Sequence, residues 1–310
     1  MTPSHNSHKK KTNTRTRAAI AVAVAGGIAA VSAGIASASG TFDTHAGAHH
    51  HFGLGAELPS GGKVSTLSSH TSVVSRLAAL SPHKGGAPKV VPDSVDLSKY
   101  AIEPGNQGQV GSCVSWAIDY SGYSIQEKQQ GISGGPQAPM YTYAQISKGN
   151  DQGSTPDDTF SIAESQGVDS KSDYTQGDFD FTTQPSDAER QNAAHWKLSG
   201  HTKLHTGNQI QADVKQALAD GEPVAISLPV HQSFQDISQQ TAADYSYQPG
   251  GDEDPVLGGH EITIVGYNDQ GVRVENSWGG NWGDGGYINL SWDFLSSQVE
   301  EANAIGKLVQ

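Results

Sequence analysis

The chain has 310 residues, of which 35% are hydrophobic and 16% charged, and its formal net charge is −13. That length fits one large domain or two ordinary ones. Residues 91–310 hold 10 Lys and Arg residues against 30 Asp and Glu residues, a balance that argues against binding to nucleic acid or to an anionic membrane. Cys113 is the single cysteine, so an intrachain disulfide, a cysteine-based zinc site and an iron–sulfur cluster are excluded.

The N-terminus has the three parts of a secretory signal. Residues 1–17 are polar and basic, residues 18–38 are apolar without a charge, and the stretch ends in Ala36-Ser37-Ala38. An uncleaved membrane anchor is the alternative, because the apolar stretch is long enough to span a bilayer. Its richness in Ala and Gly favours a signal peptide over residues 1–38 and therefore a secreted, extracellular protein.

The next zone, residues 39–90, differs in composition and is rich in Gly, Ala, Ser and His. A metal-binding group formed by His45 and residues 49–51 is one interpretation. We favour a poorly ordered pro-region or linker, because such a composition does not build a packed core. The folded domain is then expected over residues 91–310.

Within residues 91–310, helical patterns come first and strand patterns later. Apolar spacing and end signals predict helices over residues 112–130, 155–167 and 209–220. Period-two alternation predicts strands over residues 224–230, 261–267, 272–277 and 287–292. This order indicates an α+β protein in two lobes rather than a parallel βαβ sheet.

Cys113 lies where a Gly-rich loop, residues 106–112, enters the first predicted helix. The positive end of a helix favours the nucleophilic thiolate, although a lone cysteine is more often a buried structural residue. His260 begins a strand, and Asn276 ends the next one, so a hairpin brings them together. A nucleophilic cysteine needs such a base, and the base needs a partner that orients its ring.

Three stretches resemble the nucleophile, His and Asn segments of the papain-like cysteine peptidases (the papain and cathepsin family, C1). His260 follows Cys113 by 147 residues, within the spacing of that family. A fourth stretch, residues 92–97, is similar to the start of the mature enzymes. The three motif stretches are Gln107-Gly108-Gln109-Val110-Gly111-Ser112-Cys113, Gly259-His260-Glu261-Ile262-Thr263-Ile264-Val265-Gly266-Tyr267 and Glu275-Asn276-Ser277-Trp278-Gly279-Gly280-Asn281-Trp282-Gly283-Asp284-Gly285-Gly286-Tyr287.

The resemblance implies a papain-like two-lobe fold, with the Cys on the helical lobe and the His and Asn on an antiparallel β lobe. It makes Cys113 the nucleophile, His260 the base and later the acid, and Asn276 the residue that orients the imidazole. Gln107, with the backbone N–H of Cys113, would form the oxyanion hole. Trp278 would support the site by packing around Asn276.

The implied substrate-binding residues are Gly259, Ser227, Gly153 and Trp282. The chain departs from the family in having Val114 after the nucleophile and no disulfide cysteines, which indicates a disulfide-free, bacterial-type branch. Glu261 is also unusual and would stabilise an imidazolium or favour basic substrate side chains.

We therefore predict a secreted cysteine peptidase that hydrolyses peptide bonds through an acyl-enzyme, needs no cofactor or metal, and acts as a monomer on protein or peptide substrates. Two alternatives stay open. One is a catalytically silent papain-like module that binds peptides or glycans, and the other is an amidase or endopeptidase on cell-wall peptides.

Overall fold

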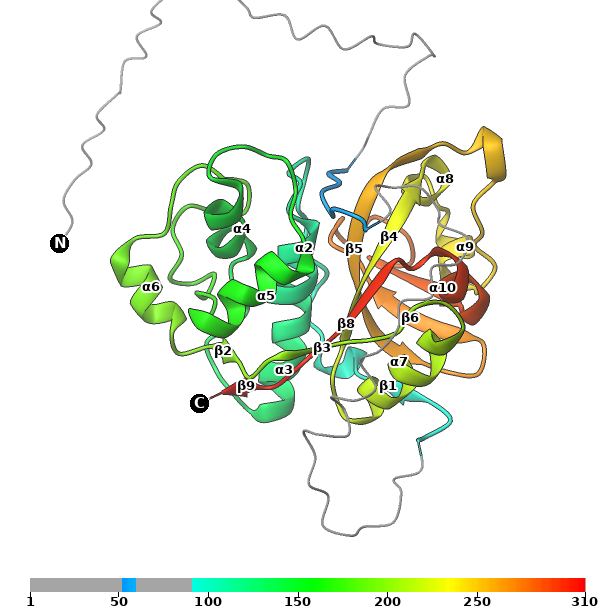
Figure 1. The fold of residues 1–310 in the computed structure, drawn as a ribbon, viewed down its shortest axis with the longest axis horizontal. Coiled ribbons are helices and arrows are strands. Elements are labelled where there is room, and N and C mark those ends of the chain that lie inside the picture. Colours follow the sequence, from blue (N-terminus) through cyan, green and yellow to red (C-terminus); the bar gives the residue numbers. More distant parts are fainter. Residues whose placement is uncertain (1–51, 60–90, 310) are drawn as a thin grey trace, which may run out of the picture. The chain divides into compact units, whose positions relative to one another are not determined.

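The computed structural model describes residues 52–59 and 91–309. The predicted signal peptide, the histidines at 45 and 49–51, and most of the zone at 39–90 lie outside the described residues. Two lobes make up the described chain, with helices in one and a sheet in the other (Figure 1). Each lobe has its own apolar core.

The helical lobe is built around the segment that begins at Cys113. The predicted helix over residues 112–130 is confirmed, but its middle, Trp116–Gly122, is a π-helix between α2 (Cys113–Ser115) and α3 (Tyr123–Gln130). Gly131, with φ of 68°, ends it in the left-handed conformation that favours glycine. Three further helices complete the lobe: α4 (Pro139–Ser147), α5 (Pro156–Ser165) and α6 (Asp187–Ala193).

The second predicted helix, α5, begins as the sequence indicated. Thr155 accepts the backbone N–H of Asp158 at 3.2 Å, and the Asp158 side chain accepts the backbone N–H of Thr155, which completes a capping box. Pro156 occupies the first helical position, where its missing N–H costs nothing. The third predicted helix is α7 (Ile210–Ala219), which packs on the β lobe.

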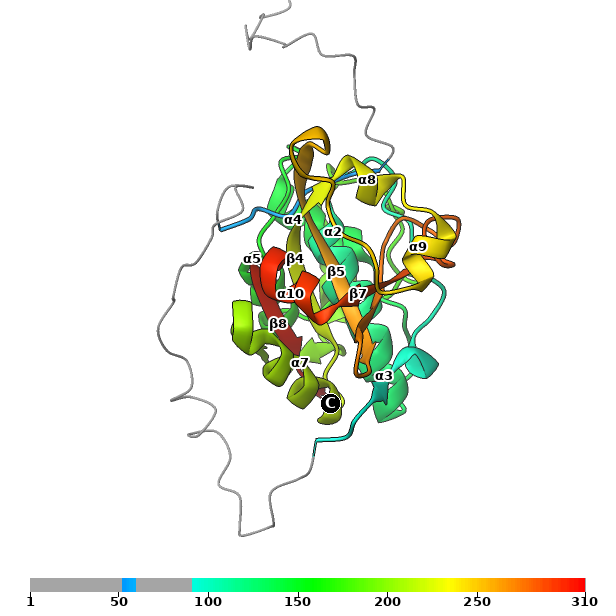
Figure 2. The same ribbon diagram turned by 90° about the vertical axis from the view of Figure 1, so that its right-hand side faces the viewer.

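The β lobe holds a seven-stranded antiparallel sheet within the described residues. Its order is β3-β8-β4-β5-β6-β7, and β1 pairs with β5. In Figure 2 the helices α7 and α10 lie in front of this sheet. The strands are β1 (Val95–Asp96), β3 (His201–Lys203), β4 (Val224–His231), β5 (Val256–Tyr267), β6 (Gly271–Glu275), β7 (Tyr287–Ser291) and β8 (Glu301–Ile305).

All four predicted strands are present, and β5 begins five residues earlier than predicted, at Val256. The short elements were not predicted. These are α4 and α6 in the helical lobe, the strands β1, β3 and β8, the helices α8 (Gln232–Gln235), α9 (Gln239–Ala243) and α10 (Trp292–Gln298) in the β lobe, and the small sheet of β2 (Lys197–Leu198) with β9 (Leu308–Val309).

Across residues 52–59 and 91–309, no helix is both long enough and apolar enough to cross a membrane. The same residues contain no group of three or more His, Cys, Asp and Glu side chains that could hold a metal ion.

Candidate active site

Cys113 is the first residue of α2 and is completely buried between the lobes. Backbone N–H groups of Glu261, Gly55 and Val114 lie close enough to its sulfur to lower the pKa of the thiol. Glu261 follows His260 directly on β5, so the thiol of the helical lobe lies against the His segment of the β lobe. The predicted place of Cys113, at a helix N-terminus beside the His strand, is confirmed.

His260 and Asn276 form the pair that the sequence predicted. Nε2 of His260 lies 2.8 Å from Oδ1 of Asn276. Because an amide oxygen only accepts, this contact assigns the ring proton to Nε2 and leaves Nδ1 as an acceptor, which has no hydrogen-bond partner here. The indole of Trp278 covers the imidazole, with ring centroids 4.4 Å apart. Trp278 therefore packs on one face of the His260 ring.

Gln107 is held rigidly beside Cys113. Its Oε1 accepts the hydroxyl of Ser277 at 2.6 Å, and its Nε2 donates to the carbonyl of Val110 at 2.9 Å. The same Nε2 donates to the carbonyl of Gly53 at 3.1 Å. The predicted donor thus already binds a peptide carbonyl, one supplied by the chain itself.

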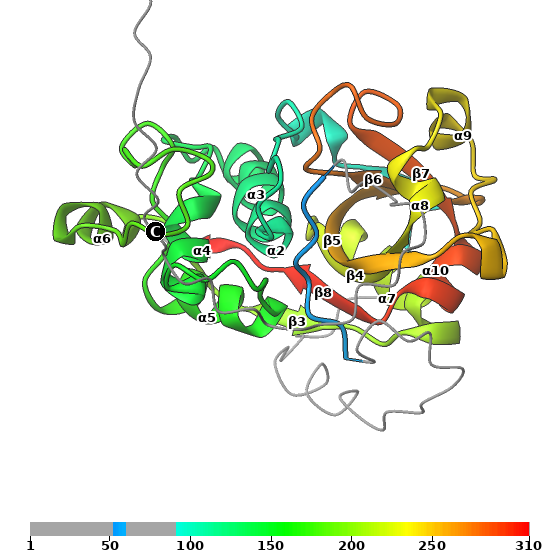
Figure 3. The same ribbon diagram turned by 90° about the horizontal axis from the view of Figure 1, so that it is seen from above.

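Residues 52–59, called the strap below, lie in the cleft between the two lobes (Figure 3). On the β side, the N–H groups of Gly55 and Ala56 both donate to the carbonyl of Gly259 at 3.1 Å. On the helical side, the strap pairs in parallel with Ser154: Glu57 donates to the Ser154 carbonyl at 3.1 Å, and Ser154 donates to the Gly55 carbonyl at 2.8 Å. The strap is an extended backbone bound on both sides.

Two glycines let the strap approach the loop before Cys113. A Cβ on Gly55 would lie 1.9 Å from the carbonyl oxygen of Gly111, and one on Gly53 would lie 2.4 Å from that of Val110. Both distances are far below van der Waals contact, so neither position accepts a side chain without displacement. A cavity of about 410 Å³ lies along the strap.

The aromatic ring of Phe52, at the start of the strap, stacks on Trp278 with centroids 4.8 Å apart and planes 8° from parallel. For residues 52–59, the expectation of a poorly ordered linker is therefore wrong. The sequence could not reveal this order, because it comes from backbone pairing with the folded domain and leaves no periodic pattern.

Burial sets the protonation of both central groups in this covered state. It raises the pKa of Cys113 to about 12 and lowers the pKa of His260 to about 4. Taking charge out of water disfavours thiolate and imidazolium alike, so the pair is neutral near pH 7. Burial disfavours the thiolate expected from the helix N-terminus, because desolvation outweighs the effect of the backbone N–H groups near the sulfur.

The predicted substrate-binding residues divide into two sets. Gly259 binds the strap directly, and Gly153 lies against it, because a Cβ on Gly153 would be 2.2 Å from the Gly55 carbonyl oxygen. The residue that forms the backbone pairing, however, is Ser154, which the sequence reasoning missed by one position. Backbone recognition uses no side chain, so no residue type marks this position.

The structure does not place Ser227 and Trp282 against the strap. The hydroxyl of Ser227 donates to the carboxyl of Glu261, and both residues are buried. Trp282 donates its indole N–H to the Phe234 carbonyl at 3.2 Å and packs edge-on against Trp278. Trp278 thus contacts both the His260 ring and the Phe52 ring of the strap, and Trp282 packs against Trp278.

Glu261 does not fit the role of a charged partner for His260. Burial raises its pKa to about 8, so the carboxyl is largely protonated near pH 7. A neutral acid does not stabilise an imidazolium. Its second oxygen, Oε1, is buried without a hydrogen-bond partner.

Comparison with known proteins shows the family and the fold of this chain. The sequence profile described as "Papain family cysteine protease" matches residues 91–305. A peptidase C1-like protein of Acanthamoeba polyphaga mimivirus is 25% identical over 232 residues, which cover 68% of this chain and 73% of the relative. A cathepsin L-like proteinase of Fasciola hepatica is 24% identical over 217 residues, and the match covers 66% of this chain and 61% of that relative.

Among solved structures, xylellain, a cysteine protease from Xylella fastidiosa, superposes with a TM-score of 0.66 at 21% identity. The superposition covers 84% of this chain and 99% of xylellain. That likeness shows the papain-like fold in a bacterial protein. Because the profile match extends over most of the described chain, the chain belongs to the papain family of cysteine proteases.

Proposed function

We propose that this protein is a secreted cysteine peptidase in which Cys113 is the nucleophile, His260 the general base and acid, and Asn276 the residue that orients His260. His260 takes the thiol proton, and the sulfur attacks the peptide carbonyl carbon. The C–N bond then breaks, and the amine leaves with the proton from His260. Water, deprotonated by the same imidazole, hydrolyses the thioester and releases the acid and Cys113.

Gln107 Nε2 and the backbone N–H of Cys113 stabilise the oxyanion that forms during the attack. The observation that carries the proposal is the strap itself. Its backbone is extended, its Gly53 carbonyl accepts from Gln107, and it lies over Cys113. A polypeptide therefore fits this cleft with one of its carbonyl groups hydrogen-bonded to Gln107 Nε2, the donor that the proposed reaction requires.

We propose the domain organisation that the sequence predicts: residues 1–38 are a signal peptide, residues 39–90 a pro-region or linker, and residues 91–310 the peptidase. The contacts of the strap support a pro-region rather than a linker.

The strap keeps the precursor latent because it occupies the groups that a substrate would use: Gln107 donates to the Gly53 carbonyl, and the Gly259 carbonyl accepts from Gly55 and Ala56. A peptide substrate cannot bind these groups while the strap holds them.

The decisive test compares the chain that begins at Val91 with its Cys113→Ala variant. We expect the first to hydrolyse casein and to be inactivated by one equivalent of E-64, and the variant to lose at least about 10³-fold in rate. Purified peptidoglycan, assayed beside casein, identifies a cell-wall activity. Equal rates for the two chains, or full activity after Cys113 is labelled, would contradict the proposal.

A further inference from the structure

The nucleophile and the edge that pairs with the strap belong to different segments of the helical lobe. Gly111 lies two residues before Cys113, and Gly153 immediately precedes Ser154, the residue that pairs with the strap backbone. A bound peptide contacts both segments at once. Their spacing therefore decides where its carbonyl group lies relative to the sulfur.

A continuous set of hydrogen bonds joins these two segments. Oδ1 of Asp151 accepts the backbone N–H of Gly111 at 2.9 Å and the hydroxyl of Tyr143 at 2.5 Å. The Tyr143 hydroxyl in turn accepts the backbone N–H of Gly153 at 3.0 Å. A single carboxylate oxygen and a single hydroxyl thus connect both backbones.

Packing fixes the Tyr143 end of this connection, whereas Asp151 lies at the exposed surface. Tyr143 is completely buried in α4, where its ring packs edge-on against Phe181. A Cβ on Gly111 would lie 3.0 Å from Asp151 Oδ1, 3.3 Å from the Tyr143 hydroxyl and 3.2 Å from the Leu54 carbonyl of the strap. The connection and the bound backbone therefore meet at the same point of the cleft.

We propose that Asp151 and Tyr143 are positioning residues that fix the distance between Cys113 and the substrate-pairing edge at Ser154. This inference rests on the proposed function. A peptide held at Ser154 reacts only if its carbonyl lies in line with the sulfur, and an error of about 1 Å costs on the order of 10²-fold in rate. The fold has no disulfide here, because Cys113 is the only cysteine, so hydrogen bonds hold this spacing.

A positioning role and a purely structural role predict different results for substrates of different length. A peptide amide long enough to pair with Ser154 uses the spacing, whereas a single-residue ester reaches only Cys113. Loss of positioning lowers kcat/KM for the peptide alone. Simple destabilisation of the fold removes active molecules and lowers both rates equally.

The variants Tyr143→Phe, Asp151→Ala and Asp151→Asn are made in the full-length chain that also carries Gly55→Val, which forces the strap from Gly111. Rates are divided by the number of sites titrated with E-64, so molecules that stay latent do not count. Tyr141→Phe is the matched control, because it removes a hydroxyl of the same helix that bonds to Gln166 at 3.2 Å.

We expect Tyr143→Phe and Asp151→Ala to lower kcat/KM for the peptide by about 10-fold to 100-fold, and for the ester by less than about twofold. Asp151→Asn should recover most of the loss, because its amide oxygen accepts the same two donors. An unchanged ratio of peptide to ester rates in Tyr143→Phe and Asp151→Ala would overturn the inference alone. A parent chain that neither titrates nor hydrolyses either substrate would overturn the proposed function and this inference with it.

Discussion

The neutral state of Cys113 and His260 follows from the size of two opposing effects. A helix N-terminus stabilises a nearby negative charge by about 0.3–2 kcal/mol. Raising the pKa of Cys113 from 9.0 to about 12 corresponds to about 4 kcal/mol against the thiolate. Burial under the strap therefore decides the protonation of the thiol. The helix end can favour the thiolate only after water has returned to the cleft.

Glu261 provides a prediction about stability. Its pKa is raised in the folded protein from 4.5 to about 8, so folding favours the protonated acid. The stabilisation is complete below about pH 4.5 and is lost as the pH rises toward 8. The Glu261→Gln side chain is neutral at every pH. At pH 8 the free energy of unfolding of this variant should therefore exceed that of the unmodified protein by up to about 4 kcal/mol, and at pH 4.5 the two values should differ little.

Urea unfolding of both proteins at pH 4.5 and 8 measures this effect. Glu253→Gln is the control, because Glu253 is exposed on the surface of the same lobe and should change neither value by much. If Glu261→Gln and the unmodified protein lost the same stability between these pH values, the buried carboxyl would not be the cause.

Site residues that act through their side chains could be predicted from the sequence, whereas residues that act through their backbone groups could not. Cys113, His260, Asn276 and Gln107 have side chains that few other residue types could replace in the proposed reaction, so their identity and spacing marked them. Ser154 contributes only its N–H and carbonyl groups, which every residue except proline has. Asp151 and Tyr143 act through neighbouring backbone groups, and no spacing rule connects them to Cys113.

The predictability of the elements follows their length. The helices α5 and α7 span ten residues each with an apolar stripe, and α5 has a capping box, so pattern and end signals agreed. The helices α8 and α9 have four and five residues, too few to show a period. The strand β8 has five residues, Glu301–Ile305, and two of them are alanines, which are depleted in strands, so its composition does not mark it as a strand.

Close packing of Gly55 against Gly111 is expected to hold the strap over Cys113. Gly55→Val in the full-length chain should displace the strap, because even a Cβ at this position would overlap the Gly111 carbonyl. Iodoacetamide should then alkylate Cys113 near pH 7.5 at least about 10-fold faster than in the unmodified chain. In the unmodified chain the rate should rise only as the pH approaches about 12, the pKa of the covered thiol.

Mass spectrometry measures the alkylation without ambiguity, because the chain has one cysteine. Glu57→Val is the matched control, since it introduces the same side chain at an exposed position of the strap. Equal alkylation of the Gly55→Val and Glu57→Val chains would show that close packing of Gly55 does not hold the strap in place.

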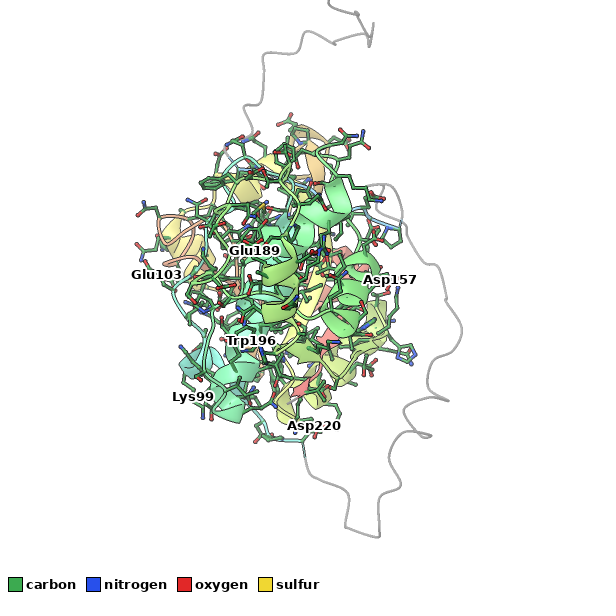
Figure 4. All side chains as sticks on the ribbon, turned by 90° about the vertical axis from the view of Figure 1, so that its left-hand side faces the viewer. Lys99, Glu103, Asp157, Glu189, Trp196 and Asp220 are labelled. Atoms are coloured by element: carbon green, nitrogen blue, oxygen red, sulfur yellow. The ribbon has the colours of Figure 1, made fainter. Side chains whose placement is uncertain are left out.

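At the scale of the whole molecule, the peptidase domain is strongly acidic. Residues 91–310 carry 20 more acidic than basic side chains. Exposed acids occur on both lobes, and Glu103, Asp157 and Asp220 lie on the face shown in Figure 4. The sequence predicted this charge and the two-lobe division. It did not predict that a segment outside the domain closes the cleft between the lobes.

The negative field predicts how the pH profile of the uncovered enzyme responds to salt. Activity requires the thiolate of Cys113 and the imidazolium of His260, so the profile is bell-shaped, with a lower limb from the thiol and an upper limb from the imidazolium. A negative domain favours retention of both protons, and it therefore displaces both limbs toward higher pH. Salt screens the field over a Debye length of about 10 Å at 0.1 M.

For the Gly55→Val chain, we expect both limbs to move down by roughly half a pH unit between low and high salt. Sodium and potassium chloride should act alike, because screening depends on ionic strength and not on the cation. Limbs that do not move, or that move in opposite directions, would show that local contacts rather than the field of the domain set the two pKa values.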